Sequence, residues 1–546
     1  MPTPQEFAAL QQALLEATRQ REEATHRSET LVRELRLVRT ERDLLQEQLN
    51  KFKRQLFAAK SEALELNGTH QKDMFFNEAE DLGAGIEPAV EDRACVDAKL
   101  VDVPGLVGAH QRIKRGRKPL DPALPREIVR HELPASERVC PHDGAALKEI
   151  GVEATEQLDI IPQQVRVIRH ERVKYACPCC DAGMRLAAKP AQVIAKGLFT
   201  EGLLAWVITS KYMDGLPLYR QAALLGRFGG SDLSRNTMAA SLVRVGQAVQ
   251  PLINLLRDQL LDSPLIYGDE TVIQVLKEPG RKAQSKSYMW AQMTEGSGVL
   301  GTGPPIRLFE YGPSRNTEVS MRLYAGARAG GALMTDGYEP YEQVAKVNKL
   351  VHLACWAHCR RYFFEAMQAL PKDQRGPEQL AVKFMTLIGK LYQVESQAKQ
   401  EGSDARALLL RRQAQSVDVI DEIKQLLQTH LHAVAPKTLL GRALHYAKGQ
   451  WPKLERFVKD GSYPIDNNAC ENSIRPFVIG RRNWLFADTV AGANASANLY
   501  SLLQTCKANG IDGYAYLRKL LTELPKASAA DDYEALLPWS IGVTAN

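Results

Sequence analysis

Three acidic residues, Asp269, Asp336 and Glu471, stand in the sequence where they could share divalent cations. Asp269 follows the apolar run at residues 265–267, and Asp336 follows the run at residues 332–334. Two carboxylates held side by side repel each other unless a cation neutralises them. Mg²⁺ and Mn²⁺ bind through oxygen ligands, and a pair of such ions stabilises the attacking and leaving oxygens of a phosphoryl transfer. We therefore predict that these acids are both the catalytic residues and the ligands of two Mg²⁺ or Mn²⁺ ions.

The first two acids can meet only if the strands that precede them are neighbours. The sequence predicts five strands, at residues 265–267, 287–294, 306–311, 332–334 and 350–353, with a helix at 317–324. Three strands, a helix and a further strand, with acids at the ends of the first and fourth strands, is the ribonuclease H-like order. In that fold the first and fourth strands are adjacent, so we expect Asp269 and Asp336 to project side by side.

The third acid is expected on a later helix. Glu471 follows Asp466 and Asn467, either of which can cap that helix. The residues beyond it offer phosphate contacts and stacking surfaces for nucleic acid, namely Arg475, Arg481, Arg482, Trp484 and Phe486. Isolated acids are usually solvated surface groups, and Glu270 and Asp466 are competing candidates for the same roles.

Two cysteine-bearing turns predict a structural zinc site ahead of this core. The candidate ligands are Cys140, His142, Asp143, Cys177 and Cys180. Cys177 and Cys180 have the C-x-x-C spacing that lets two thiolates bind one ion, and Cys179 could substitute for a neighbour. The first turn has His142 or Asp143 where a second cysteine would stand. With the β-rich stretch at 163–176, the arrangement resembles a zinc ribbon, in which metal replaces a core too small to fold alone. The alternative is a β-ribbon that packs its cysteines as ordinary apolar groups.

A run of basic residues precedes the zinc module. Its members are Arg112, Lys114, Arg115, Arg117 and Lys118. Such a run, with a glycine inside it and a proline after it, can lie extended in a narrow minor groove. The alternative, which its short and incomplete match to such peptides favours, is contact with phosphates without regard to sequence.

A helix-turn-helix is expected between the zinc module and the acidic core. Residues 216–225 and 235–249 read as two helices joined by a glycine-containing break, and Asp232 or Ser234 can cap the second. The side chains that would face the bases are Arg235 and Asn236. Many helical hairpins of this kind bind nothing, so its place before the acidic core is what supports a role with DNA.

The beginning of the chain predicts a coiled coil. From Leu10 to Leu56, one seam of positions follows alternating steps of four and three residues, which keeps one face of a helix toward a partner. Charged and polar residues surround the seam, which favours self-association over a single helix lying on the enzyme body. The acidic stretch that follows, broken by Gly, Ala and Pro, predicts a mobile linker, with shielding of basic surfaces as a second role.

Length and composition limit the classes of protein that fit. The chain has 546 residues, 45% of them hydrophobic, and a formal net charge of +6, so it can build several folded domains. It has neither an apolar stretch long enough to cross a bilayer nor the apolar core of a signal peptide, so we expect a cytoplasmic protein without membrane partners. Nine cysteines in a reducing compartment indicate metal binding or burial rather than disulfides.

The expected fold class is multidomain α/β, with a ribonuclease H-like catalytic core that contains a helical insertion. The expected domains are a coiled-coil oligomerisation helix (1–66), an acidic linker (67–111), the basic segment with the zinc-ribbon-like module (112–190), the helix-turn-helix region (191–260), the first part of the core (261–370), the helical insertion (371–460), the core helix with the third acid (461–500) and a C-terminal helical tail (501–546).

Several longer blocks resemble the insertion sequence 66 family of bacterial transposases. These blocks are Gly-Asp269-Glu-Thr, Thr-Asp336-Gly-Tyr, Cys355-Trp-Ala-His358-Cys-Arg-Arg-Tyr and the run from Asp466 to Phe486. The resemblance covers nearly the whole chain and implies cleavage at terminal inverted repeats followed by strand transfer. It implies Asp269, Asp336 and Glu471 as metal ligands, and a helical insertion between the second Asp and the Glu.

The resemblance also implies partners and a place in the cell. The partners are transposon ends, target DNA, further copies of the chain joined through the coiled coil, and companion proteins of the same element, in the cytoplasm of a bacterium at its nucleoid. Two positions depart from the family pattern. Asp143 stands where a cysteine is often found, and Asn472 follows the third acid where an arginine is often found.

Three alternatives accompany this interpretation. A non-catalytic, sequence-specific DNA-binding repressor would explain the zinc and helix-turn-helix segments but not the paired acids. A ribonuclease H-like nuclease would cut DNA without joining it. A second metal site at Cys355, His358 and Cys359 is also conceivable, but the aromatic residues around these side chains favour core packing over zinc.

Overall fold

The computed structural model describes residues 163–176, 184–230, 233–296, 303–371 and 374–542, together with 16, 19–21, 24, 27, 31, 127–130 and 145. The described residues between 16 and 31 are helical and exposed. Several candidate residues of the sequence analysis lie outside the described residues: Arg112, Lys114, Arg115, Arg117, Lys118, Cys140, His142, Asp143, Cys177 and Cys180. The acidic linker and most of the expected coiled coil also lie outside them.

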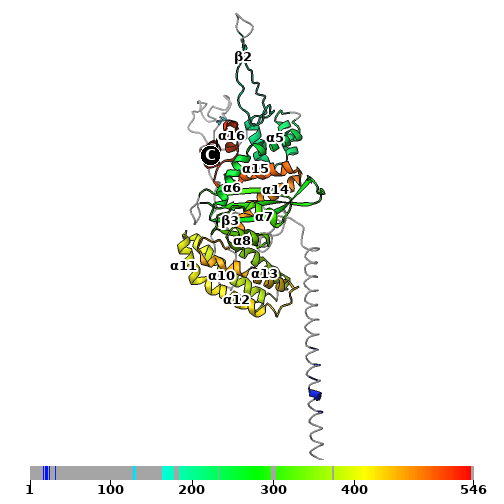
Figure 1. Ribbon diagram of the computed structural model, residues 1–546, viewed down its shortest axis with the longest axis vertical. Coiled ribbons are helices and arrows are strands. Elements are labelled where there is room, and N and C mark those ends of the chain that lie inside the picture. The colour runs from blue at the N-terminus through cyan, green and yellow to red at the C-terminus, as the bar shows by residue number, and fades with distance from the viewer. Residues whose placement is uncertain are drawn as a thin grey trace, which may run out of the picture.

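A six-stranded mixed sheet lies at the centre of the described body (Figure 1). Its strands are β3 (Leu265–Lys277), β4 (Lys286–Thr294), β5 (Ile306–Gly312), β6 (Ala332–Thr335), β7 (Val351–Ala354) and β8 (Ala487–Thr489). The strand order is β5-β4-β3-β6-β7, and β8 pairs with the far end of β3. The first three strands are antiparallel, whereas β6, β7 and β8 run parallel to their neighbours. The protein is therefore a mixed α/β protein.

The burial of each strand follows from its neighbours. All four residues of β6 are buried, as expected of a parallel strand covered on both faces. From Thr271 onward β3 alternates buried and half-buried residues, which is typical of a strand with one face on the core. Strands β3 and β6 therefore lie in the interior of the sheet, and they lead to Asp269 and Asp336.

Helices cover both faces of the sheet. They are α6 (Gln250–Leu261), α7 (Thr317–Leu323), α8 (Pro340–Val347), α9 (Trp356–Ala369), α14 (Asn468–Trp484) and α15 (Val490–Ala508). α15 is buried along most of its length and lies against the edge strand β5. The hydroxyls of Ser501 and Thr505 accept hydrogen bonds from the backbone N–H groups of Phe309 (2.8 Å) and Arg307 (3.1 Å). Side chains of α15 thus accept hydrogen bonds from backbone N–H groups that would otherwise be unpaired at the edge of the sheet.

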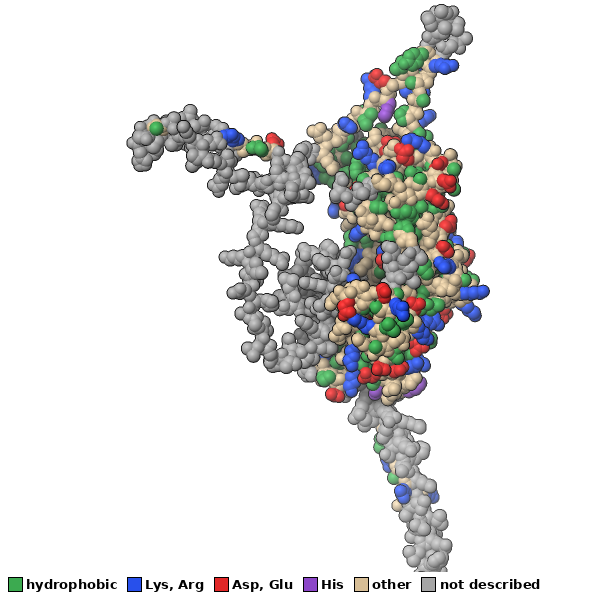
Figure 2. All heavy atoms as spheres, turned by 90° about the vertical axis from the view of Figure 1, so that its left-hand side faces the viewer, with side chains coloured by type: hydrophobic (Ala, Val, Ile, Leu, Met, Phe, Trp, Pro, Cys, Tyr) green, Lys and Arg blue, Asp and Glu red, His purple; other side chains and the backbone are tan. Residues whose placement is uncertain are grey.

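A second body of helices lies on the side of the sheet opposite α5 (Arg235–Ala248) and α16 (Gly513–Glu523) (Figure 1, yellow). It comprises α10 (Leu380–Gln400), α11 (Ala405–Gln415), α12 (Val417–His430), α13 (Leu439–Leu454) and η5 (Glu455–Lys459). Helices α9, α10, α12 and α13 and η5 share a hydrophobic core of their own, in which the rings of Phe363 and Phe384 stack at 4.2 Å between centroids. The indole N–H of Trp356, the first residue of α9, donates to the carbonyl of Leu454 in α13 at 2.9 Å, which joins α9 to the other helices of this body. Acidic and basic side chains are interspersed over the visible face of this body (Figure 2).

A small hairpin and three further helices precede α6 and the sheet in the described part of the chain. They are β1 (Lys174–Ala176), β2 (Met184–Leu186), α3 (Glu201–Tyr212), α4 (Leu218–Arg227) and α5 (Arg235–Ala248). β1 and β2 pair in an antiparallel hairpin that projects from the body (Figures 1 and 2). The Ser234 hydroxyl caps α5 by accepting the N–H of Asn236 at 3.2 Å, as the sequence predicts.

The C-terminal elements belong to the body and not to a separate appendage. They are α15, α16 (Gly513–Glu523), η6 (Leu524–Lys526) and α17 (Ala530–Glu534). The expected boundary between core and tail, at residue 500, falls inside the continuous helix α15, whose buried residues extend to Cys506. Among the described helices, none is both long enough and apolar enough to span a membrane.

Candidate active site

Strand register brings the first two acids to the same level of the sheet. β3 and β6 run parallel, with Tyr267 opposite Met334 as the last pair, so Asp269 and Asp336 each lie two residues further along. Asp269 does not stand at the end of its strand, as the sequence analysis expects, but within the long strand β3. The strand continues because its antiparallel pairing with β4 runs on to Gln274 after β6 has ended.

The third acid reaches the same place from α14. Glu471 lies in the first turn of this helix and is 2% exposed. The side-chain amide of Asn467, the N-cap residue, donates to the carbonyl of Gly268 at 3.1 Å, directly before Asp269. This contact fixes the start of α14 on β3.

Electrostatic interactions show that the three acids share one site. Burial raises the pKa of Asp269 well above its usual value, and the negative charges of Glu270 and Asp336 raise it further. Burial likewise raises the pKa of Glu471, with added contributions from Asp269, Asp466 and, more weakly, Asp336. Asp336 thus contributes to the field at both Asp269 and Glu471, and Asp269 contributes to the field at Glu471. Together with the strand register and the contact of Asn467 with Gly268, these interactions place the three acids near one another.

This carboxylate site fits a divalent cation. Its donors are carboxylate oxygens, the ligand type that Mg²⁺ and Mn²⁺ prefer. Asp269 and Glu471 are buried with like charges beside them, so their ionised forms are costly without a compensating cation. The side chain of Asp336 keeps 22% of its surface exposed, which leaves the site open to solvent at that residue.

A fourth acid, Glu270, lies beside the site and has partners of its own. Its side chain is 1% exposed and forms an ion pair with Arg315. Arg315 also lies 3.5 Å from Asp336, and its guanidinium stacks 3.8 Å from the ring centroid of Tyr338. The hydroxyl of Tyr341 donates to Glu270 at 2.5 Å. Burial and the charge of Asp336 raise the pKa of Glu270 to about 7, against the opposing effect of Arg315.

The sequence analysis missed Arg315, Tyr338 and Tyr341 as parts of this site. Arg315 lies in the connection before α7, and Tyr341 lies in α8. No spacing along the chain relates them to Glu270, which is 45 residues from Arg315 and 71 from Tyr341. The motif Asp336-Gly-Tyr338 is the one signal that could have pointed to the ring beside the guanidinium.

Asp466, the other competing acid, has a different environment. One of its oxygens accepts the backbone N–H of Asn468 at 3.1 Å, and the other accepts the hydroxyl of Tyr392 at 2.9 Å. Burial raises its pKa. These contacts anchor the residue to the start of α14 and to α10, so its carboxylate is already engaged away from Asp269.

The predicted nucleic-acid contacts of α14 lie in different environments. Arg482 is exposed and Arg475 is half-buried. Arg481 donates to the carbonyl of Val272 in β3. Trp484 is half-buried, with the ammonium of Lys211 located 3.5 Å from its ring centroid. Arg481 and Trp484 therefore hold α14 against the body, and their contact with DNA remains a prediction.

The predicted base-reading residues Arg235 and Asn236 are exposed at the start of α5. The two helices α4 and α5 lie where the sequence predicts them, with the break between residues 228 and 234. Their role in reading DNA also remains a prediction.

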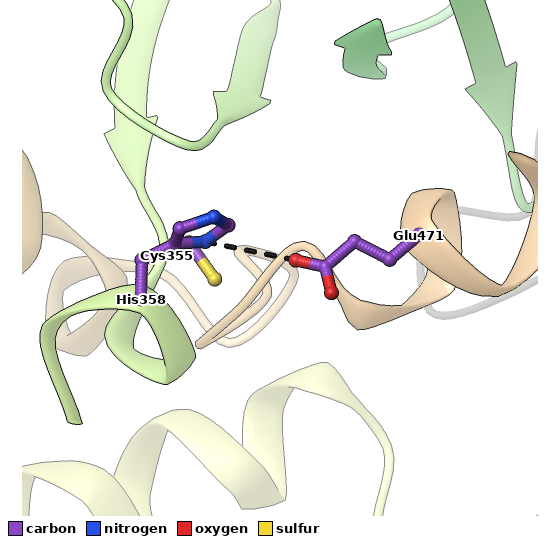
Figure 3. Close-up of side chains that lie close together, drawn as sticks. All are labelled: Cys355, His358 and Glu471. Carbon is purple, nitrogen blue, oxygen red and sulfur yellow. Dashed lines mark ion pairs between the residues drawn. The ribbon is translucent and has the colours of Figure 1, made fainter. Parts of the chain in front are cut away.

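Cys355 and His358 lie beside Glu471. Cys355 is the N-cap residue of α9, and His358 follows within the first turn of that helix. Their side chains face the carboxylate of Glu471 (Figure 3). Cys359, the third residue of the second metal hypothesis, is 1% exposed and belongs to the core of the helical body instead. The third member of this cluster in the structure is therefore Glu471 and not Cys359.

The chain matches four family descriptions. It matches "Transposase IS66 family" over residues 196–495 and "zinc-finger binding domain of transposase IS66" over residues 137–181. It matches "IS66 C-terminal element" over residues 501–539 and "Transposase C of IS166 homeodomain" over residues 44–129. No solved structure matches the chain.

Three similar proteins come from Sinorhizobium fredii (strain NBRC 101917 / NGR234), and each is described as uncharacterized. The protein y4qI is 34% identical over 441 residues, which cover 79% of this chain and 78% of the relative. The protein y4jD is 30% identical over 426 residues, covering 76% and 81%. The protein y4hP is 28% identical over 464 residues, covering 83% and 82%.

These matches, together with the acidic site on a mixed sheet, define the class of protein as DNA-binding transposases. The chain belongs to the IS66 family of transposases, which confirms the resemblance seen in its sequence blocks. The zinc-finger match also supports a structural zinc ion within residues 137–181.

Proposed function

We propose that this chain is a DDE transposase. It binds the terminal inverted repeats of an insertion sequence, cleaves the ends by metal-dependent phosphodiester hydrolysis and joins them to target DNA. The observation that carries the proposal is the convergence of three separate elements: strand register sets Asp269 and Asp336 at one level, and Asn467 fixes the start of α14, which carries Glu471, on β3. The family to which the chain belongs supports the same activity.

The topology supports a ribonuclease H-like core. Three antiparallel strands are followed by parallel strands on the other side of β3, in the order β5-β4-β3-β6-β7. Strands β3 and β6, the first and fourth of the sheet along the chain, are neighbours. Asp269 lies in β3 and Asp336 directly follows β6, at one level of the sheet. Helices α10 to α13 interrupt this core between β7 and α14, as an inserted domain would.

In this proposal, the fold of the chain holds the three acidic side chains in position to bind metal ions. Asp269 and Asp336 extend from neighbouring strands, and Glu471 is held on α14 by the contact of Asn467 with Gly268. Two bound Mg²⁺ or Mn²⁺ ions would supply neutralisation of charge on the scissile phosphate and on the attacking and leaving oxygens. A transfer of this kind needs no covalent protein–DNA intermediate, so we assign no nucleophilic side chain.

Other parts of the chain would bind the DNA. We propose the zinc module, the basic segment and the exposed start of α5 as DNA contacts, and the N-terminal coiled coil as the means by which copies of the chain bring two ends together. The structural zinc would be held by residues from Cys140, His142, Asp143, Cys177 and Cys180. Companion proteins of the same element and action at the bacterial nucleoid belong to the same proposal.

Substitution of each acid tests the proposal. Asp269→Asn, Asp336→Asn and Glu471→Gln should each lower cleavage of inverted-repeat DNA by more than the roughly 10–100-fold that loss of an outer-shell partner of a metal costs. DNA binding should stay largely intact, because the amides keep the shape of the site. Cleavage is measured with purified protein, Mg²⁺ or Mn²⁺, labelled end DNA and a target plasmid.

The matched control is Asp262→Asn, which changes an exposed Asp at the end of α6. It should cleave like the unsubstituted chain. Persistent cleavage by Asp269→Asn would show that this residue is not a ligand. The products also separate the rival functions, because a repressor gives only a gel shift, a nuclease gives only nicks, and a transposase gives joined DNA.

A further inference from the structure

A cluster of mixed chemistry adjoins the carboxylate site. Cys355 Sγ, one ring nitrogen of His358 and one carboxylate oxygen of Glu471 all lie within 4.8 Å of one another (Figure 3). Residues three apart on a helix lie on the same face, so the spacing of Cys355 and His358 directs both toward α14. The cluster therefore joins the first turn of α9 to the first turn of α14.

The distances suit ligands that share one ion. Nδ1 of His358 lies 3.6 Å from Oε1 of Glu471, which is longer than a hydrogen bond. Bonds of about 2.0–2.2 Å separate a nitrogen and an oxygen ligand of a tetrahedral ion by about 3.3–3.5 Å, and a sulfur ligand at about 2.3 Å lies about 3.5–3.7 Å from either. The measured nitrogen–oxygen distance is longer than the first interval by about 0.1 Å. The sulfur lies within 4.8 Å of both atoms and reaches its place with a shift of about 1.3 Å or less.

Backbone contacts hold the cluster in place. The N–H of Asn467 donates to Cys355 Sγ at 3.2 Å, and the N–H of Trp356 donates to the carbonyl of Ile465 at 3.1 Å. Burial and the charges of Asp466 and Glu471 raise the pKa of the Cys355 thiol well above its usual value, and the backbone hydrogen bonds from Asn467 and His358 oppose this rise. The thiolate that binds metals therefore forms here only when an ion displaces the proton. Cys355 is fully buried and the side chain of His358 is 12% exposed, so the cluster has one side near solvent.

The local charge also favours a cation. Glu471 is influenced by the negative charges of Asp269 and Asp466, and the basic group that opposes them is Arg361 of α9. A bound divalent ion would add positive charge beside Glu471, whose ionised form the negative charge of Asp269 disfavours. It would lie at the side of Glu471 that faces α9.

We propose that Cys355, His358 and Glu471 bind one transition-metal ion of the Zn²⁺ type, separate from the ion of the zinc finger. Sulfur, imidazole and carboxylate ligands together suit Zn²⁺, whereas Mg²⁺ takes oxygen ligands. Three protein ligands leave a fourth position open to water or a substrate oxygen, unlike a closed structural site. Binding releases the thiol proton of Cys355 to solvent. Any link between this ion and DNA cleavage rests on the proposed function, since Glu471 is shared, but metal binding itself does not.

Metal content of the full chain tests the inference. The unsubstituted chain, Cys355→Ala and His358→Gln are purified, equilibrated with Zn²⁺ alone, dialysed and analysed by mass spectrometry for zinc per chain. The unsubstituted chain should hold one more ion per chain than either variant. The zinc of the zinc finger is common to all samples and cancels in this comparison.

Two matched controls separate a ligand role from a folding effect. Cys359→Ala removes a buried sulfur that belongs to the helical core, and His432→Gln changes an exposed histidine. Both should retain the zinc of the unsubstituted chain. In Co²⁺-loaded protein, the thiolate-to-metal absorption should weaken in Cys355→Ala and not in Cys359→Ala. Circular dichroism checks folding, and if Cys355→Ala does not fold, His358→Gln decides alone.

Equal zinc in the unsubstituted chain and in folded His358→Gln would overturn the inference, as would loss of the ion from Cys359→Ala. The result is distinguishable from a failure of the proposed function. Asp269→Asn should stop cleavage while the chain still holds this ion. A chain that binds the ion but never cleaves DNA contradicts only the proposed function, and a chain that cleaves DNA without the ion contradicts only this inference.

Discussion

Asp269 and Glu270 are adjacent on β3 but have different partners. Successive side chains of a strand point to opposite faces. Glu270 contacts Arg315 and the hydroxyl of Tyr341, whereas the charge of Asp269 acts on Glu471. Asp336 and Arg315 influence both acids. The charge of Glu270 is therefore compensated by groups of the protein. The charge of Asp269 requires a bound cation for its compensation. This difference explains how two neighbouring acids of the same motif can have separate roles.

At the residue scale, we predict that Arg315→Met lowers the free energy of unfolding by about 1–3 kcal/mol. Loss of one partner leaves the buried carboxylate of Glu270 uncompensated, and the partial exposure of Arg315, 36% of its side chain, reduces the cost of breaking a buried ion pair. Denaturant unfolding followed by circular dichroism measures the change. The double variant Glu270→Gln with Arg315→Met should recover part of the loss, and an equal or larger loss in the double variant would contradict the pairing.

At the element scale, α5 and α15 cross so closely that one glycine decides the packing. A Cβ atom built on Gly246 would lie 2.5 Å from Cβ of Ala495, closer than two side chains can approach. The side-chain amide of Asn498 donates to the carbonyl of Gly246 at 2.8 Å across the same crossing. The crossing joins the predicted DNA-binding helix to the helix that covers the sheet.

We expect Gly246→Ala to destabilise the protein by about 1–3 kcal/mol, because overpacking outweighs the gain in helix propensity. The matched control is Gly226→Ala in α4, where a Cβ would meet no atom within 4 Å. That change should leave the stability unchanged or raise it by up to about 1 kcal/mol. Thermal unfolding of both variants is the measurement, and a stabilised Gly246→Ala would show that the two helices do not cross as described.

Most elements of the sheet core were predictable because they are local patterns. The strand expected at 287–294 is β4, and the helix expected at 317–324 is α7. The strand expected at 265–267 is far longer in β3, because polar Thr271 and Gln274 conceal its continuation while pairing with β4 maintains it. The placement of α15 on β5 was not predictable, since it depends on hydroxyls 192 and 198 residues from their partners.

At the scale of the whole molecule, the sheet body and the helical body meet around the acidic site. The hydroxyl of Tyr446 in α13 donates to the carbonyl of Asp336 at 2.8 Å, and the amide of Gln450 donates to the carbonyl of Gly337 at 3.2 Å. The inserted helices therefore support the second acid directly. Their packing is part of the geometry of the site, in addition to any surface that they offer to DNA.

Assembly is the prediction that belongs to this scale. Deletion of residues 1–56 should leave a monomer, because the heptad seam that holds copies together is removed. Light scattering of the full chain and of the shortened chain measures the change in mass. Replacing Leu31 and Leu35 with lysine in the full chain is the finer test, since it disrupts the seam without changing the length. An oligomer that survives both changes would refute the role of the coiled coil.

The sequence by itself determined the class of elements, the three acids and the family, because each is written in local spacing or in contiguous blocks. Only the tertiary structure decided which neighbours those acids have. Arg315 and Tyr341 reach Glu270, and Cys355 and His358 reach Glu471, across tens of residues or more than a hundred. Such contacts depend on strand register and on where helices cross, and neither leaves a periodic signal in the chain.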